Sequence, residues 1–269
     1  YWRDWSSDVC SSDLLAIFDN DKSLDPKRIL QDIFALNYDK IVPGSTLLFF
    51  DEVQNSPRAI TALRYFYEEM PELHVIAAGS LLDFAIEKVG IPVGRVRSLY
   101  MYPLSFIEFL VALGNKNAVE RLLESSNSIF SSSAHTELLD LVGKYLAVGG
   151  MPEAVNEWIA TSNINECLNV HQGLIDTYQQ DFGKYAKASQ IDYVARVFDS
   201  IPHQLGGKFK YTAIEGNFRK RELEPALDLL KTAGIAHKIF HTAAHGIPLG
   251  AEVDLSFYKT MLMDIAIGQ

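Results

Sequence analysis

Residues 47–54 read Leu47-Leu48-Phe49-Phe50-Asp51-Glu52-Val53-Gln54, an apolar run that leads directly into two acids. Four bulky apolar residues without alternation are typical of a strand that is buried on both faces, as in a parallel sheet covered by helices. The two acids then stand at the carboxyl end of that strand. Open α/β sheets bind their ligands at this edge, so the stretch predicts both a parallel sheet and the position of a site.

The order of the two acids is typical of the Walker B pattern of a nucleotide-hydrolysing site. Asp51 would hold the hydrated Mg²⁺ that bridges the β- and γ-phosphates, because this ion prefers carboxylate and water oxygens. Glu52 would orient and polarise the attacking water as the catalytic base. A buried strand that merely ends in exposed acids at a turn is the alternative for the string taken alone.

The residues after the acids predict a helix and then a second strand. Ser56 and Pro57 match a helix start, with Ser56 as N-cap and Pro57 at the first helical position. Apolar residues recur at helical spacing up to Pro71, at Ile60, Leu63, Tyr67 and Met70. The next apolar segment, 74–78, stops at Gly79-Ser80 on the same edge of the sheet. Ser80 is therefore a candidate sensor of the γ-phosphate or the attacking water, although Gly-Ser is also a common turn pair.

Five ordered motifs cover most of residues 15–269: LLFFDEVQNSPRAITALRYFYEEMPELHVIAAGSLLDFAI, PVGRVRSLYMYPLSFIEFLVALG, YLAVGGMPEAV, IDTYQQDFGKYAK and KFKYTAI. Together they resemble the prokaryotic predicted AAA+ superfamily ATPases that carry a C-terminal domain of unknown function. The resemblance implies a partial P-loop NTPase sheet, with ATP and Mg²⁺ as cofactors. It leaves open whether the chain forms a homo-oligomer. It also implies Asp51 as the metal ligand, Glu52 as the catalytic base and Ser80 as sensor 1.

Arg95 and Asp181 also fall within these motifs. Arg95 follows the helix after the second strand, where it could present a positive charge to the γ-phosphate of its own or a neighbouring site. A surface arginine in a loop is the alternative. Arg64 could similarly pair with Glu68 four residues later on one helix. No role for Asp181 follows from the sequence.

The Walker A loop, GxxxxGK[ST], is missing from this sequence. The only lysines before Asp51 are Lys22, Lys27 and Lys40, and none follows the required glycines. That loop supplies backbone donors and a lysine to the phosphates, so we expect little or no ATPase activity from this chain. We expect a fragment that starts after the Walker A loop and stops within the C-terminal domain.

Residues 1–14 are expected to be a sequencing artefact. The run DWSSDVCSSDL, residues 4–14, is what a common sequencing-adapter string encodes when it is translated. A genuine Ser/Asp-rich amino terminus is the alternative. We then expect a strand to begin near Leu15 and a partial ATPase core to occupy residues 15–125.

A helical lid and a winged-helix-like α+β segment are predicted for the rest of the chain. Residues 126–189 are predicted as a helical lid and linker, in which the Ser-rich stretch 125–133 is the linker and the helices follow at 138–147, 152–160 and about 165–187. Residues 190–269 then read as helix, basic turn, helix and a short β-like pair in the run IAHKIFHTA, with a recognition-type helix at 222–233.

Basic residues gather just before that last helix, at Lys208, Lys210, Arg219, Lys220 and Arg221. Helix-turn-helix proteins contact DNA phosphates near this point, so residues 208–233 are a candidate surface for DNA or a protein partner. The chain carries a formal net charge of −10. Because phosphate binding depends on Lys and Arg, this charge favours a solvated basic face or a protein-docking surface over DNA.

His237, His241 and His245 recur at intervals of four residues. Two histidines at this spacing on a helix can chelate zinc, but the segment is predicted as strand and turn, without Cys or acid at ligand spacing. We therefore expect no metal site there.

Composition predicts a globular chain with two domains. It has 269 residues, 48% of them hydrophobic, which suffices for a sizeable core. There is no apolar run of eighteen residues and no signal peptide, so neither a membrane span nor export is expected. Without the first 14 residues a single cysteine remains, Cys167, which fits the reducing cytoplasm.

Two functions remain open at this point. The first is a fragment of a Mg²⁺-dependent AAA+ ATP-binding protein or ATPase. The second is a winged-helix regulatory module for DNA or protein that uses the nucleotide as a switch.

Overall fold

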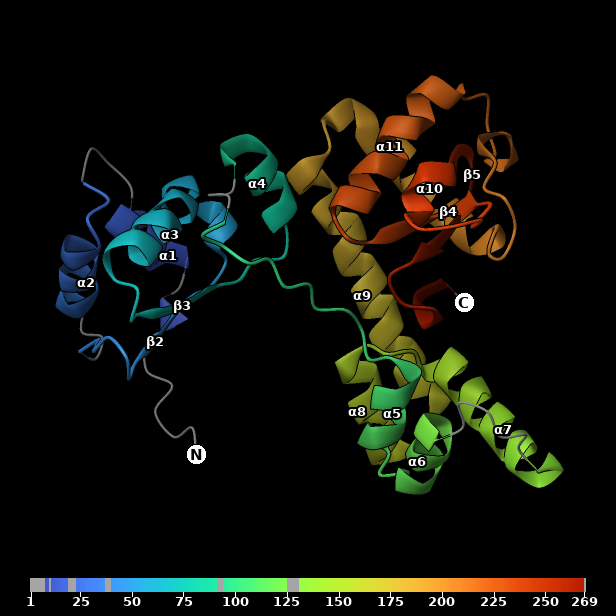
Figure 1. Cartoon of the computed structure of the whole chain (residues 1–269). Helices are drawn as coiled ribbons and strands as arrows, with labels where there is room; N and C mark the ends of the chain where they lie inside the picture. The colour runs from blue at the N-terminus through green and yellow to red at the C-terminus, as the bar shows by residue number, and fades with distance from the viewer. Residues whose placement is uncertain are drawn as a thin grey trace. The chain divides into compact units, whose positions relative to one another are not determined.

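The chain divides into two compact units, residues 1–100 and 101–269 (Figure 1). The computed structural model describes residues 8–9, 11–18, 23–36, 40–90, 94–124 and 131–268. The division differs from the expected end of the first domain at residue 125. Helices α5 (Phe106–Ala112) and α6 (Lys116–Glu124) share a hydrophobic cluster with the helices that follow them, and this packing places them in the second unit.

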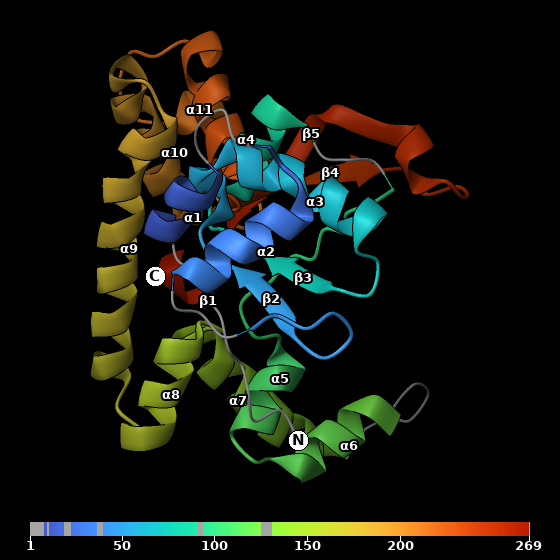
Figure 2. The ribbon, with the colours of Figure 1, turned by 90° about the vertical axis from the view of Figure 1, so that its left-hand side faces the viewer.

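A three-stranded parallel sheet in the order β1-β2-β3 forms the centre of the first unit (Figure 2). Its strands are β1 (Asp8–Val9), β2 (Leu47–Phe50) and β3 (His74–Ala77). The described residues of this unit also form the α-helices α1 (Ser11–Phe18), α2 (Pro26–Ala35), α3 (Pro57–Glu69) and α4 (Leu82–Val89).

The predicted strand, helix and strand at residues 47–77 are confirmed. The Ser56 hydroxyl caps α3 by accepting the Ala59 N–H at 3.4 Å, and Pro57 is the first helical residue. Burial of β2 is stronger on one face. Leu48 and Phe50 are fully buried, because they pack against residues of α1, α2 and α3 in the core of this unit. Leu47 and Phe49, which point to the other face of the sheet, are only half-buried.

The expectation of a strand near Leu15 is wrong. Residues 11–18 form helix α1, whose Leu14, Ile17 and Phe18 recur at helical spacing and are buried in the first core. Arg28 and Arg58 cap its end by donating to the carbonyls of its last two residues, at 3.2 and 2.7 Å. Residues 1–7 and 10 of the expected sequencing artefact lie outside the described residues. The structure of the other residues up to Leu14 does not test whether they are an artefact.

One long helix joins two hydrophobic clusters in the second unit. The helices are α7 (Ser132–Val148), α8 (Pro152–Thr161), α9 (Ile164–Tyr185), α10 (Ile191–His203) and α11 (Lys220–Thr232), which confirms the helices predicted between residues 138 and 187. Helix α9 contributes Cys167 to the cluster with α5 and α7, and Phe182 to the cluster with α10 and α11 (Figure 1).

The second sheet is a two-stranded antiparallel ladder of β4 (Ala236–Thr242) and β5 (Val253–Leu262). The expected pair within residues 235–243 is therefore wrong, because that run supplies only one strand. Its partner comes from the segment after residue 252. The Phe209 N–H donates to the Tyr258 carbonyl at 3.0 Å, so the chain before the 3₁₀ turn Tyr211–Ala213 joins the edge of β5.

A buried carboxylate ties the turn between α7 and α8 to the residues after β5. Asp264, 3% exposed, accepts the Gly150 N–H at 2.6 Å and the Ala266 N–H at 2.8 Å. Gly149 has φ +75°, and a Cβ there would lie 2.2 Å from Asp264 Oδ1. A Cβ on Gly150 would lie 2.1 Å from the Leu104 carbonyl oxygen. Both glycines are therefore required for this approach.

Among the described residues, no helix combines the length and the apolar character that crossing a membrane would need.

Candidate functional site

The carboxyl edge of β2 and β3 brings together the acids and the serine singled out in the sequence. Beyond the strands, the Ala78 N–H donates to the Phe50 carbonyl at 2.8 Å, and the Val53 N–H donates to the Ala78 carbonyl at 2.9 Å. These bonds hold the segment that contains both acids against the residues that precede Ser80. Asp51, Glu52 and Ser80 therefore share one edge of the sheet.

The backbone turns sharply between the two acids. Glu52 has φ 53° and ψ 41°, the left-handed region that non-glycine residues seldom adopt. The Glu52 N–H donates to Asp51 Oδ1 at 3.0 Å. Asp51 is exposed and Glu52 is half-buried. This left-handed residue turns the chain directly after Asp51, at a local cost of about 1 to 2 kcal/mol, and the two acids differ in exposure.

Gln54 holds the Glu52 carboxylate. Its Nε2 donates to Glu52 Oε2, while its Oε1 is buried with no hydrogen-bond partner in the described part of the chain. A Cβ on Gly79 would lie 1.9 Å from that Oε1, so the glycine gives the amide its space. Neither the role of Gln54 nor that of Gly79 was predicted from the sequence. The signal was an amide two residues after Glu52, together with a glycine two residues after the end of β3.

Two polar groups at this edge are available to a ligand. The Ser80 side chain is exposed, and its hydroxyl makes no hydrogen bond to other described residues. The same holds for Asp51 Oδ2, since the hydrogen bond to this carboxylate is at Oδ1. A carboxylate oxygen and a hydroxyl at one sheet edge suit a metal-bound phosphate.

Arg95 lies at the other end of the sheet. Its Nε donates to Glu68 Oε1 at 2.8 Å, and Arg64 Nε donates to the same oxygen at 2.9 Å, which confirms the predicted Arg64–Glu68 pair. Glu68 is in the last turn of α3, and this crossover helix runs back from the acids toward the start of β3. The structure therefore does not bring Arg95 to Asp51 and Glu52. The hydrogen bond from Arg64, helped by Arg95, lowers the pKa of Glu68.

The edge fits a hydrated Mg²⁺ only in part. Asp51 supplies one carboxylate oxygen, which is the ligand type that Mg²⁺ prefers. Within the described ranges no group of three or more His, Cys, Asp or Glu side chains could hold a metal by itself. Mg²⁺ usually keeps several waters and takes further ligands from substrate phosphates. The residues present therefore suit an ion that arrives with a nucleotide.

The remaining candidates belong to the second unit. His237 and His241 are on β4, and His245 in the following loop has its Nδ1 3.2 Å from Glu252 Oε2. Asp181 on α9 pairs with Lys184, whose Nζ is 2.7 Å from Asp181 Oδ1.

The five basic residues predicted as a candidate surface, Lys208, Lys210, Arg219, Lys220 and Arg221, lie in the segments around the 3₁₀ turn Tyr211–Ala213 and at the start of α11. Lys220 Nζ lies 3.2 Å from Glu224 Oε1, and Lys208 Nζ lies 4.9 Å from the centroid of the Phe257 ring. At least two of the five charges therefore already have partners within the unit.

Two family models match separate parts of the chain, and the first match extends ten residues beyond the first unit. Residues 10–110 match the family model of an AAA domain, and residues 139–269 match a domain of unknown function (DUF8612). The fold is similar to that of the Walker-type ATPase PABY2304 of Pyrococcus abyssi, with TM-score 0.54 and 16% identity, over 96% of this chain and 73% of that chain. No curated protein matches the sequence. The chain thus joins a part similar to the AAA domain of P-loop ATPases to a C-terminal part that matches a domain of unknown function.

Proposed function

We propose that the carboxyl edge of β2 and β3 is the hydrolytic half of a Mg²⁺-dependent ATP site. One observation carries the proposal: Asp51, Glu52 and Ser80 share a sheet edge inside the residues that match an AAA domain. Parallel sheets of this class bind nucleotides at that edge.

Each side chain has a distinct task in this proposal. Asp51 offers Oδ2 to a hydrated Mg²⁺, and the bound ion would neutralise charge on the β- and γ-phosphates. Glu52 orients the attacking water and accepts its proton. Gln54 fixes the carboxylate of Glu52 through the hydrogen bond to Oε2. Ser80 donates its hydroxyl to the γ-phosphate or to the water.

The proposal also explains why this chain should turn over ATP slowly or not at all. The sequence has no GxxxxGK[ST] string to supply the phosphate cradle and its lysine. Incubation of this polypeptide with Mg²⁺ and ATP should release no phosphate above background. Hydrolysis of even one equivalent of ATP would contradict that expectation.

The decisive experiment starts at the source locus, with the codons before Leu15. An in-frame strand followed by GxxxxGK[ST] there would define the longer chain in which the acids are tested. In that chain Glu52→Gln should retain ATP binding and lose turnover by about 100-fold or more. Asp51→Asn should weaken the binding of Mg²⁺ with ATP.

A matched control is Glu72→Gln, an exposed acid before the start of β3, at the opposite edge. This substitution should change neither binding nor turnover. Unchanged turnover in Glu52→Gln would overturn the assignment of the base. The locus could instead encode the same amino terminus and no phosphate loop. Nucleotide binding would then replace ATP hydrolysis as the proposed function.

Arg95 is proposed only as a group that acts on a neighbouring site, because its pair with Glu68 lies far from the acids of its own unit. In the longer chain, Arg95→Ala should then lower turnover only under conditions where the protein self-associates. Equal loss in dilute, monomeric protein would contradict this role.

A second candidate function is a winged-helix module that docks a protein partner. The order α10, 3₁₀ turn, α11, β4 and β5, with the Phe209 to Tyr258 backbone bond, supports this arrangement. Glu224 and Asp228 pair with Lys220 and Lys238 on and beside α11, so acids reduce the positive charge that DNA would need.

Fluorescence anisotropy with duplex DNA tests this choice. We expect only weak binding at physiological salt, and a further loss in Lys210→Glu or Arg221→Glu if phosphates are contacted. Tight and sequence-selective DNA binding would overturn the preference for a protein partner. A phenotype that survives Glu52→Gln in the longer chain would favour the module, with nucleotide as a switch, over hydrolysis.

A further inference from the structure

Helix α7 has apolar residues on two opposite faces. Leu138, Leu141 and Val148 point into the cluster with α5 and α9. On the other side Leu139 and Leu146 are 55% and 43% exposed. A helix that is apolar on both sides is normally covered on both. Leu139, which is more than half exposed, is therefore open to contact with a further surface.

We propose that this second side is a twofold interface between two copies of the chain. We call it the α7 face, and define it as Leu139, Asp140, Gly143, Lys144, Leu146 and Ala147. These residues recur every three to four positions and so lie along one side of the helix. The inference concerns the second unit alone and does not depend on the proposed nucleotide site.

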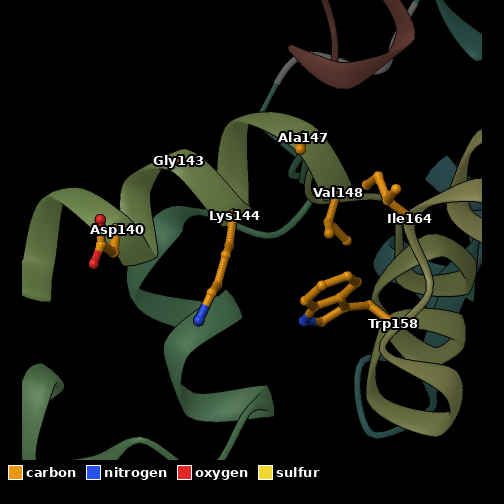
Figure 3. A pocket seen from close by; sticks show the side chains of 7 residues that line it. All are labelled: Asp140, Gly143, Lys144, Ala147, Val148, Trp158 and Ile164. Atoms are coloured by element: carbon orange, nitrogen blue, oxygen red, sulfur yellow. The ribbon is translucent and has the colours of Figure 1, made fainter.

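A groove beside the α7 face gives the second copy a place to pack. It has a volume of about 420 Å³ and lies between α7 and the side chains of Trp158 and Ile164 (Figure 3). A Cβ added to Gly143 would meet no atom within 4 Å. The missing side chain therefore leaves room for close approach of a second helix. Figure 3 shows Asp140 and Lys144 along the same stretch of α7 as Gly143.

The charges on the α7 face are complementary to themselves. Asp140 and Lys144 are one turn apart on the same flank, and neither has an ion-pair partner among the described residues. If two copies pack with their α7 helices antiparallel, the twofold axis crosses α7 near residue 142. Asp140 of each copy then faces Lys144 of the other. Such isologous contacts occur twice in every dimer.

The apolar residues select nearly the same axis. With the axis between residues 142 and 143, Leu139 of one copy lies opposite Leu146 of the other, and the Gly143 backbones meet near the centre. The charges and the leucines thus agree on one register to within half a residue. A partner of another sequence would not require this internal symmetry, and for that reason a second copy is the occupant that we infer.

The test is the oligomeric state of the chain by sedimentation velocity over a wide range of concentration. The unmodified chain should form dimers as concentration rises. Asp140→Lys and Lys144→Asp should each raise the dimer dissociation constant about tenfold or more, because each turns two attractions into two repulsions. Gly143→Leu should also weaken the dimer, since its side chain occupies the space of the second helix.

Charge exchange separates this interface from a general loss of fold. An equimolar mixture of Asp140→Lys and Lys144→Asp chains should form a heterodimer, because both pairs then become attractive. The double variant Asp140→Lys/Lys144→Asp should dimerise by itself. Matched controls are Lys116→Asp and Glu120→Lys, exposed residues with the same spacing on α6, and neither should change the dissociation constant.

Two results would overturn the inference. The first is a chain that stays monomeric at every concentration. The second is a dimer whose dissociation constant is unchanged in both single variants, or is raised in them without recovery in the mixture and in the double variant.

Discussion

Asp51 and Asp264 both follow strands, yet the fold uses them in opposite ways. Asp51 comes directly after β2, is exposed and accepts one backbone N–H. Asp264 comes two residues after β5, is 3% exposed and accepts two backbone N–H groups from segments far apart in the chain. A buried carboxylate persists only where the fold supplies donors, whereas an exposed one keeps lone pairs for a ligand. An acid at a strand end therefore indicates a site only when few backbone donors reach it.

Glycines are needed beside Glu52, the residue after Asp51, and beside Asp264, but for different reasons. Gly79 makes space for Gln54, a flexible side chain that positions Glu52. Gly149 and Gly150 make space for the carboxylate of Asp264 and for the backbone at Leu104, which cannot move aside as easily. Substitution at the two places should therefore differ in cost.

The largest effect is expected from Asp264→Ala. It leaves the buried N–H groups of Gly150 and Ala266 without an acceptor, which should lower the free energy of unfolding by about 2 to 5 kcal/mol. Asp51→Ala should change it by less than about 0.5 kcal/mol, because the side chain is exposed. Urea unfolding followed by circular dichroism measures both. Equal losses in the two variants would show that the two carboxylates contribute alike to stability.

Gly150→Ala is expected to follow in size. Its Cβ would lie 2.1 Å from the Leu104 carbonyl oxygen, so the backbone must shift, at a cost of about 1 to 3 kcal/mol. The matched control is Gly173→Ala in α9, where a Cβ meets no atom within 4 Å. That change should raise stability by about 0.5 to 1 kcal/mol through helix propensity. Thermal unfolding should show a lower melting temperature for Gly150→Ala and a higher one for Gly173→Ala. A change of the same sign in both variants would show that the contact at Gly150 does not limit stability.

Gly79→Ala should cost less, about 1 kcal/mol, because the amide of Gln54 can swing away. In the double variant with Gln54→Ala the clash is gone, so the two changes should not be additive. A double-mutant cycle in urea measures the coupling. Strict additivity would show that Gly79 and Gln54 do not meet in solution.

The smallest effect is expected at Glu68. Arg64 and then Arg95 lower its pKa below the ordinary value of 4.5, so its ionised form is favoured in the folded chain. The stabilisation is present above the ordinary value and is lost as the pH falls through the lowered pKa. Glu68→Gln should therefore be less stable than the unmodified chain at neutral pH and should approach it in acid. A difference that stays constant with pH would exclude this linkage.

Local signals predicted the parts of the fold that they control. Ser56 and Pro57 specify the start of α3, and the apolar run before Asp51 specifies β2, so strand, helix and strand followed from the sequence. The helices after residue 131 carried their own periodicity in the same way. The edge position of Ser80 followed from the parallel connection, because such strands end on one side.

The missed features depend on contacts between distant residues. Asp264 meets Gly150 across 114 positions, and neither residue reveals the other in the sequence. The strand opposite β4 lies beyond a loop, so a pair within one short run was the nearest local guess. The first helix was missed because the preceding residues were set aside, although Leu14, Ile17 and Phe18 have helical spacing. The role of Gln54 depends on Gly79, which lies 25 positions later in the chain, just after β3.

The continuity of α9 has a consequence for how the second unit unfolds. The helix has 22 residues and carries Cys167 in one cluster and Phe182 in the other. Because a helix propagates more readily than it nucleates, fraying that starts in one cluster removes turns on which the other depends. The two clusters should therefore lose their structure in one cooperative transition, and a rotation of one against the other would have to bend α9 between them.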